Sequence, residues 1–266
     1  MAIPWSALLL GVIEGITEFL PISSTGHLLV AEQWLGARSD LFNIAIQSGA
    51  ILAVTFVYRD RLGGLVRGIR QPENRVYAGQ LALAFIVTAA LGFGAMHLGF
   101  KLPTGVQPVA WALVLGGIWM LLAEAIATRL PRSDRITWPV ALAVGIAQVA
   151  AGIFPGLSRS ATTIFAAMLI GSRDRSVATE FSFLAGIPTM YAATAYELCH
   201  ALCRAGGTRP DWYSLSAAFV ASAISALLAV KWLLGYIKNH RFTMFAWYRI
   251  VLGVILGMAI VLGWAQ

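Results

Sequence analysis

The sequence predicts an all-α, polytopic integral membrane protein, and three observations support this fold class. Hydrophobic residues make up 59% of the 266 residues and charged residues only 12%, whereas a soluble domain has about 25% charged residues. Six apolar segments are long enough to cross a bilayer, which takes about 20 residues. Two further pairs of shorter apolar segments are each broken at a proline, as re-entrant helical hairpins would be.

The expected elements form the same series twice, a broken pair followed by three spans. The broken pairs are residues 5–20 with 25–35, and 138–154 with 158–170. The spans are 41–58, 76–98, 106–128, 177–201, 212–237 and 242–265, with a basic loop over 59–75. This gives ten helices in a single membrane domain, residues 1–266.

An internal repeat relates residues 1–134 to residues 135–266 at an offset of 134. The pairs that match are Gly11 with Gly145, Glu14 with Gln148, Pro21 with Pro155, Ser24 with Ser158, and Ser48 with Ser182. Each half has three spans, an odd number, so the second half enters the membrane from the opposite side. This is an inverted-topology repeat, whose sites lie at the repeat interface. We therefore expect the two breaks to meet, bringing residues 158–160 towards residues 14–27.

The basic residues are unequally divided between the two sides of the expected membrane. One side carries twelve: Arg59, Arg61, Arg67, Arg70, Arg75, Arg129, Arg132, Arg135, Arg173, Arg175, Lys238 and Arg241. The other carries four: Arg38, Lys101, Arg204 and Arg209. The positive side is normally cytoplasmic, which places both termini and the opening of the first broken pair on the outer side.

Glu14 and Glu18 lie in the first broken pair, among apolar residues. A charge near the membrane centre costs about 2.5–3.5 kcal/mol on insertion scales, so such residues indicate function. Spaced four apart, the carboxylates share one helix face and repel each other. We expect a cation beside them or a proton on one. A divalent ion such as Mg²⁺ or Ca²⁺ would satisfy both oxygen-rich side chains.

The polar residues after Pro21 favour an anionic ligand. Ser23, Ser24 and Thr25 can cap the next helix, whose first backbone N–H groups bind anions. Gly26 lets a ligand approach the backbone, and His27 is a candidate acid, base or nucleophile.

Arg159 follows the second break and has no membrane interface within reach. Its planar guanidinium suits bidentate binding of phosphate. The neighbours that we expect to contact the same ligand are Gly156, Ser158, Ser160 and Thr162.

The motifs at residues 14–27 and 155–163 resemble those of the undecaprenyl-diphosphate phosphatase family, the integral-membrane bacitracin-resistance proteins. Segments 46–54 and 180–184 extend the resemblance over the whole chain, although Ala161 replaces a usual glycine. The resemblance implies hydrolysis of undecaprenyl diphosphate to the monophosphate and inorganic phosphate at the outer face of the bacterial cytoplasmic membrane. This reaction recycles the lipid carrier for peptidoglycan synthesis and gives bacitracin resistance.

For that reaction we expect four catalytic residues: Glu18, Ser24, His27 and Arg159. Glu14 and Glu18 are the expected ligands of the divalent cation. Three nucleophiles remain open, namely Ser24, His27 or a water activated by Glu18, and we favour Ser24 with Glu18 as its base or as a metal ligand.

Two other classes of function fit the same pattern. Paired broken helices also suit a polyprenyl-phosphate flippase or transporter. A protein that only sequesters the diphosphate is disfavoured, because phosphate binding alone would not need carboxylates. The net charge of +7 is explained by basic cytoplasmic loops rather than by nucleic-acid binding. Partners are then the lipid substrate, membrane lipids and, left open, a second copy of the chain.

Several polar residues lie outside the two motifs. Gln47 and Glu180 are expected to line the site behind the residues that touch the ligand. Glu124, which has no motif around it, and Arg249, near a span end, receive no catalytic role.

Overall fold

The computed structural model describes residues 5–98, 105–130, 134–172, 174–203 and 211–263, and these ranges contain eleven helices. They are α1 (Trp5–Thr17), α2 (Ser24–Leu35), α3 (Asp40–Val57), α4 (Arg59–Arg67), α5 (Pro72–His97), α6 (Val106–Ala127), α7 (Trp138–Ile153), α8 (Arg159–Ile170), α9 (Arg175–Cys203), α10 (Trp212–Tyr236) and α11 (Thr243–Val261). The all-α class is confirmed. The expected count of ten is wrong by one helix, α4.

The helix lengths confirm a polytopic membrane protein. Among the described residues, α5, α6, α10 and α11 are long and apolar enough to cross a bilayer. Helix α3 meets the same criterion only together with α4, from which it is bent by 61°. Helix α9 is longer still, at 29 residues, but contains Pro188 and is not among these four.

Helix α4 replaces part of the loop expected over residues 59–75. Its two leucines, Leu62 and Leu65, are three apart and face the protein, whereas Arg59, Asp60 and Arg67 are exposed. Asp60 lies in the first turn and Arg67 in the last, where each complements the helix dipole. Its polar composition and two adjacent glycines hide this short amphipathic pattern in the sequence.

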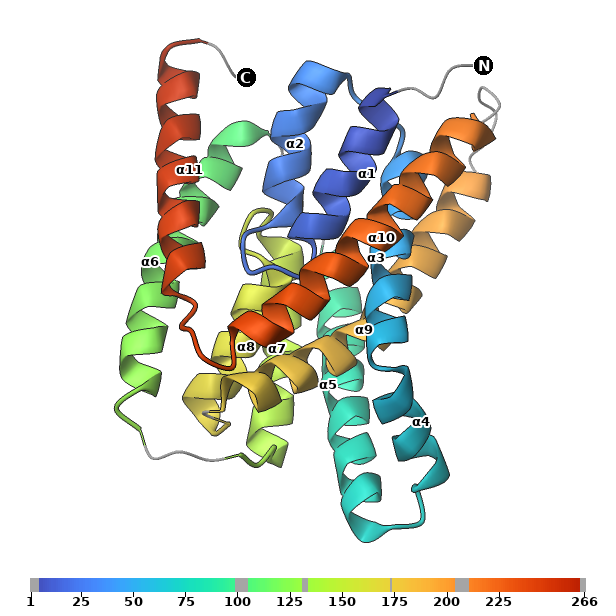
Figure 1. Ribbon diagram of the computed structural model, residues 1–266, viewed down its shortest axis with the longest axis vertical. Helices are drawn as coiled ribbons and strands as arrows, with labels where there is room; N and C mark the ends of the chain where they lie inside the picture. Colours follow the sequence, from blue (N-terminus) through green and yellow to red (C-terminus); the bar gives the residue numbers. More distant parts are fainter. Residues whose placement is uncertain (1–4, 99–104, 131–133, 173, 204–210, 264–266) are drawn as a thin grey trace.

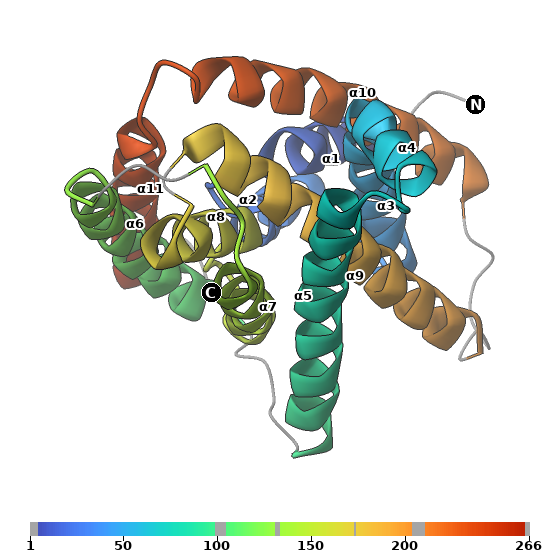
Figure 2. The ribbon, with the colours of Figure 1, turned by 90° about the horizontal axis from the view of Figure 1, so that it is seen from below.

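The two broken pairs point at each other. Figure 1 shows α1 and α2 side by side at one end of the molecule, with α7 and α8 entering from the opposite end. The segments that join each pair approach each other near the middle, and the longer helices surround them (Figures 1 and 2).

Small residues bring the helices around α1 into close contact. A Cβ atom on Gly11 would lie 2.3 Å from the carbonyl oxygen of Ala218, and one on Gly15 would lie 2.3 Å from that of Ser222. Both carbonyls belong to α10, so glycine is required for this backbone approach. Helix α1, which carries Glu14 and ends just before Glu18, is thereby fixed against a long helix.

The helix ends that carry most of the larger basic group point away from the first turn of α1 and the last turn of α11. In Figure 1 the ends of α4 and α6 lie low on opposite sides of the molecule, and the start of α9 and the end of α10 lie higher. Of the residues counted from the sequence, Lys101, Arg132, Arg173, Arg204 and Arg209 lie outside the described ranges.

Candidate active site

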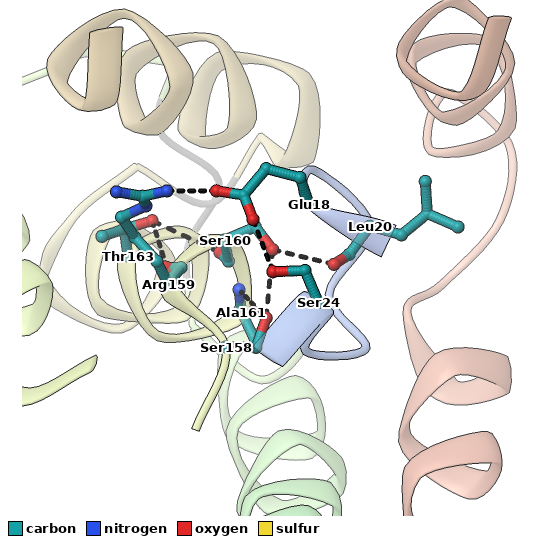
Figure 3. A network of polar contacts seen from close by, with 8 residues as sticks. All are labelled: Glu18, Leu20, Ser24, Ser158, Arg159, Ser160, Ala161 and Thr163. Atoms are coloured by element: carbon teal, nitrogen blue, oxygen red, sulfur yellow. Dashed lines mark hydrogen bonds and ion pairs between the residues drawn. The ribbon is translucent and has the colours of Figure 1, made fainter. Parts of the chain in front are cut away.

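The carboxylate of Glu18 joins the two breaks (Figure 3). One of its oxygens accepts a hydrogen bond from the guanidinium of Arg159, which also forms an ion pair with it. The other accepts a hydrogen bond from Ser24 Oγ, at 2.5 Å. The side chain of Glu18 is only 5% exposed, so water screens this ion pair weakly. The two breaks therefore meet as expected, and the cation beside Glu18 is the guanidinium of Arg159.

A second polar contact bridges the same two segments. Ser160 Oγ donates to the backbone carbonyl of Leu20 at 3.0 Å and lies 3.1 Å from Ser158 Oγ. These hydroxyls are buried and belong to α8 and its cap, whereas Leu20 belongs to the break after α1. The two breaks are therefore held together independently of the ion pair.

The residues that cap α2 and α8 have nearly the same unusual backbone conformation. Ser23 has φ 75° and ψ 97°, and Ser158 has φ 68° and ψ 108°. They are the two non-glycine residues with positive φ in the described chain. Each hydroxyl accepts a hydrogen bond at 3.3 Å from the N–H three residues ahead, in Gly26 or Ala161. Strain of about 1–3 kcal/mol at such positions is typical of functional sites.

This match corrects the alignment made from the sequence. Ser23, not Ser24, is the structural counterpart of Ser158, because the second break is one residue longer after its proline. Ser24 therefore corresponds to Arg159, and both begin a helix and contact the same carboxylate.

Glu14 lies on α1, four residues before Glu18, and is 2% exposed. Its Oε2 atom is buried without a hydrogen-bond partner in the described structure, an arrangement that costs free energy unless a ligand satisfies it. Within the described residues, no group of three or more His, Cys, Asp or Glu side chains gathers as a metal site. A cation here would thus have Glu14 and Glu18 as its carboxylate ligands and share the phosphates of a substrate, as Mg²⁺ commonly does. The residues fit such an ion.

His27 does not orient Ser24, because both of its ring nitrogens have other partners. Nδ1 lies 2.6 Å from the carbonyl oxygen of Ser23, and Nε2 lies 2.7 Å from the hydroxyl of Tyr248. The histidine is close to the first break but faces α11.

The other residues expected to bind the ligand differ in where they lie. Thr25 is exposed. Gly26 faces α6, since a Cβ there would lie 3.1 Å from Val109 Cγ1. Thr162 donates to the carbonyl of Ser158 within its own helix. Gly156 has φ 92° and also packs against α6, so its role is to shape the break.

Arg249 is the functional residue that sequence reasoning missed. It lies two turns inside α11, not near a span end, and is fully buried. Its guanidinium donates to the carbonyls of Gly156, Leu157 and Ala112, at 2.9 to 3.0 Å. It thereby fixes the shape of the second break just before Ser158.

Glu180 lies elsewhere than expected. It pairs with Arg61 of α4 at 3.0 Å, and both side chains are partly exposed. It does not line the site at Glu18. Gln47 is half-buried on α3, and its place behind the site stays a prediction.

Glu124 also has a structural role that the sequence did not indicate. It is buried, forms an ion pair with Arg175 and accepts a hydrogen bond from the backbone N–H of Phe242. It ties together the ends of α6, α9 and α11, where the larger basic group lies.

The fold and the site define a polytopic membrane protein with a buried carboxylate, hydroxyl and guanidinium cluster at its centre. The family model described as bacitracin resistance protein BacA matches residues 7–255, and the chain belongs to this family.

Curated relatives agree along nearly their whole length. An undecaprenyl-diphosphatase of Rhizobium etli is 61% identical over 94% of this chain and 95% of its own. Proteins with the same name from Xylella fastidiosa and Xanthomonas oryzae are 56% and 57% identical, over 95% and 94% of this chain and 97% and 95% of their own.

Proposed function

We propose that this protein is an undecaprenyl-diphosphatase, a hydrolase that releases inorganic phosphate from undecaprenyl diphosphate and returns undecaprenyl phosphate. The observation that carries the proposal is the contact of Glu18 with both Ser24 and Arg159. Through this buried carboxylate, a hydroxyl, its base and a cation suited to phosphate lie side by side. The names of the relatives supply the substrate.

Ser24 attacks the terminal phosphorus in this account. A serine hydroxyl is a weak nucleophile without a base, and Glu18 already accepts its hydrogen bond. As Glu18 takes the proton, the bond from Ser24 Oγ to phosphorus forms. The bond from phosphorus to the bridging oxygen breaks, and undecaprenyl phosphate leaves with that oxygen. Water then hydrolyses the phosphoserine, which releases inorganic phosphate and restores the hydroxyl.

Arg159 changes partner when the substrate binds. Its guanidinium pairs with Glu18 in this structure, and a diphosphate offers more negative charge and a bidentate surface. Moving to the phosphate leaves one oxygen of Glu18 free, while the other still accepts the hydrogen bond of Ser24. Arg159 then stabilises the charge on the transferred phosphoryl group.

Glu14 and Glu18 would hold a divalent cation, Mg²⁺ or Ca²⁺. When bound, such an ion neutralises phosphate charge and orients the diphosphate. The support for this part is the unpartnered Oε2 atom of Glu14. His27 remains as the acid–base group for the leaving or attacking oxygen.

A lipid substrate explains why the site lies within a membrane protein. The polyprenyl tail stays among lipids while the diphosphate reaches the two breaks. By the charge bias, we place the basic end in the cytoplasm and the opening of the first break at the outer face of the bacterial cytoplasmic membrane. The reaction there recycles the carrier for peptidoglycan synthesis and gives bacitracin resistance.

The opposed breaks also support an inverted-topology repeat, residues 1–134 and 135–266, and with it a second candidate function. Transporters use paired broken helices of this kind, so a polyprenyl-phosphate flippase fits the same architecture. The two functions separate in detergent, where no bilayer exists to cross.

Phosphate release by purified, detergent-solubilised protein tests the proposal. With undecaprenyl diphosphate we expect release of inorganic phosphate, lost in Ser24→Ala and in Glu18→Gln. A flippase without hydrolytic activity would release none, while still moving the lipid in reconstituted vesicles.

Orientation can be tested with introduced cysteines, after Cys199 and Cys203, both exposed, have been changed to serine. Gly206 is expected on the outer side but lies outside the described residues, so Ala37 in the exposed turn after α2 serves the same purpose. In intact spheroplasts Ala37→Cys should react with an impermeant thiol reagent, and Arg70→Cys, after α4, should not. The reverse pattern would overturn the orientation.

A further inference from the structure

Helix α11 supplies a partner to the first break that no sequence motif marks. The hydroxyl of Tyr248 lies 2.7 Å from His27 Nε2, across 221 residues of chain. The two rings are nearly parallel, with an interplanar angle of 5° and centroids 5.6 Å apart. Tyr248 is 44% exposed, whereas Glu18 is buried.

The partners of His27 determine where its proton resides. A backbone carbonyl can only accept a hydrogen bond, so the contact of Nδ1 with Ser23 assigns the hydrogen to Nδ1. Nε2 of the neutral ring is then an acceptor, and the O–H of Tyr248 is its donor. Both bonds together define one tautomer and one ring orientation.

We infer that Tyr248 is a positioning residue for the reaction, which holds His27 as the Nδ1–H tautomer and fixes the orientation of its ring. The inference rests on the proposed function, because His27 is the acid–base group there. Without the tyrosine hydroxyl, Nδ1 would still bond to Ser23, but the ring would lose the contact that fixes Nε2. Substrate binding would change little, since Tyr248 acts through His27.

The chain offers a matched control. Tyr196 and His200 of α9 also have nearly parallel rings, at an interplanar angle of 9° with centroids 6.0 Å apart. They lie four residues apart near the end of one helix, away from both breaks. Tyr196→Phe thus removes a tyrosine hydroxyl beside a histidine, without touching the site.

Two measurements test the inference. In phosphate-release kinetics, Tyr248→Phe should lower kcat about tenfold, with KM within about twofold of wild type, and Tyr196→Phe should match wild type. When combined with His27→Gln, Tyr248→Phe should cause no further loss, because the tyrosine acts through the histidine. A wild-type kcat in Tyr248→Phe, or two losses that multiply, would overturn the inference.

The second measurement does not depend on activity. In protein labelled with ¹⁵N-histidine, the signals of His27 are those lost in His27→Gln. They should report a protonated Nδ1 and an unprotonated, hydrogen-bonded Nε2. Tyr248→Phe should shift the Nε2 signal and Tyr196→Phe should not; unchanged His27 signals in Tyr248→Phe would contradict the contact. Failure of the proposed function would instead appear as wild-type protein that releases no phosphate.

Discussion

The first and second breaks share one backbone shape and carry opposite chemistry. Ser23 and Ser158 have the same positive-φ cap, and the residues that follow them, Ser24 and Arg159, contact the same carboxylate. The first break contributes hydroxyl and carboxylate groups, and the second contributes a cation. At the position of Glu14, the second half has Gln148, whose amide bonds to Thr88. A repeated scaffold has thus become asymmetric in charge, with one half suited to catalysis and the other to binding.

Exchanging the charges across the two breaks should have the largest effect. In the double variant Glu18→Arg with Arg159→Glu, an ion pair between the breaks remains available, but Ser24 loses its base. We expect phosphate release to fall by a factor of about 10³ or more. Circular dichroism and gel filtration in detergent are the folding controls. Activity within tenfold of wild type would mean that the ion pair between positions 18 and 159 has only a structural role.

The bidentate binding by the planar guanidinium of Arg159 can be tested separately from the positive charge. Arg159→Lys keeps the cation and loses bidentate binding, so we expect most activity to be lost, about 10²-fold. Near wild-type rates in this folded variant would show that Arg159 is structural.

Making the first break resemble the second should have a smaller effect. Glu14→Gln installs the side chain that the second half has at the matching position. Because a neutral amide is a poor ligand for a divalent cation, we expect a loss of about 10²-fold. Wild-type protein should lose turnover in excess chelator and regain it with Mg²⁺ or Ca²⁺. Full activity in chelator would remove the metal from the account.

The smallest effect concerns the support of the second break. A Cβ on Gly116 would lie 2.2 Å from Arg249 Nη2, so Gly116→Ala should displace the guanidinium from the carbonyls that it binds. Overpacking of this kind costs about 1–3 kcal/mol, and a misplaced Arg159 should lower activity about tenfold. Gly94→Ala is the control, since a Cβ there meets nothing within 4 Å. Equal thermal unfolding of the two variants would show that Arg249 tolerates the shift.

The two breaks and the carboxylate pair could be predicted from the sequence because the patterns that indicate them are local. Proline breaks, apolar lengths and a carboxylate pair are all visible over short stretches of chain. The same reasoning predicted the meeting of Glu18 with Arg159, 141 residues away, because the order of elements repeats.

Sequence reasoning failed at two points, for different physical reasons. The roles of Arg249 and Tyr248 were not predicted, because their partners lie 92 and 221 residues away along the chain. In addition, the sequence of an apolar helix does not show which of its polar residues face the interior. The alignment of Ser24 with Ser158 failed because the breaks differ by one residue in length, which only the caps of Ser23 and Ser158 reveal.

Trapping the proposed phosphoserine intermediate tests most directly whether the nucleophile belongs to the first break. Rapid quench with substrate labelled in the terminal phosphate should place the label on Ser24, and Ser24→Ala should abolish it. Label on Ser158 or Ser160 would mean that the nucleophile belongs to the second break, which would contradict the account. Label on an acid-labile phosphohistidine would make His27 the nucleophile. An unlabelled protein, with ¹⁸O from water entering the product by a single inversion at phosphorus, would replace serine attack by direct attack of water.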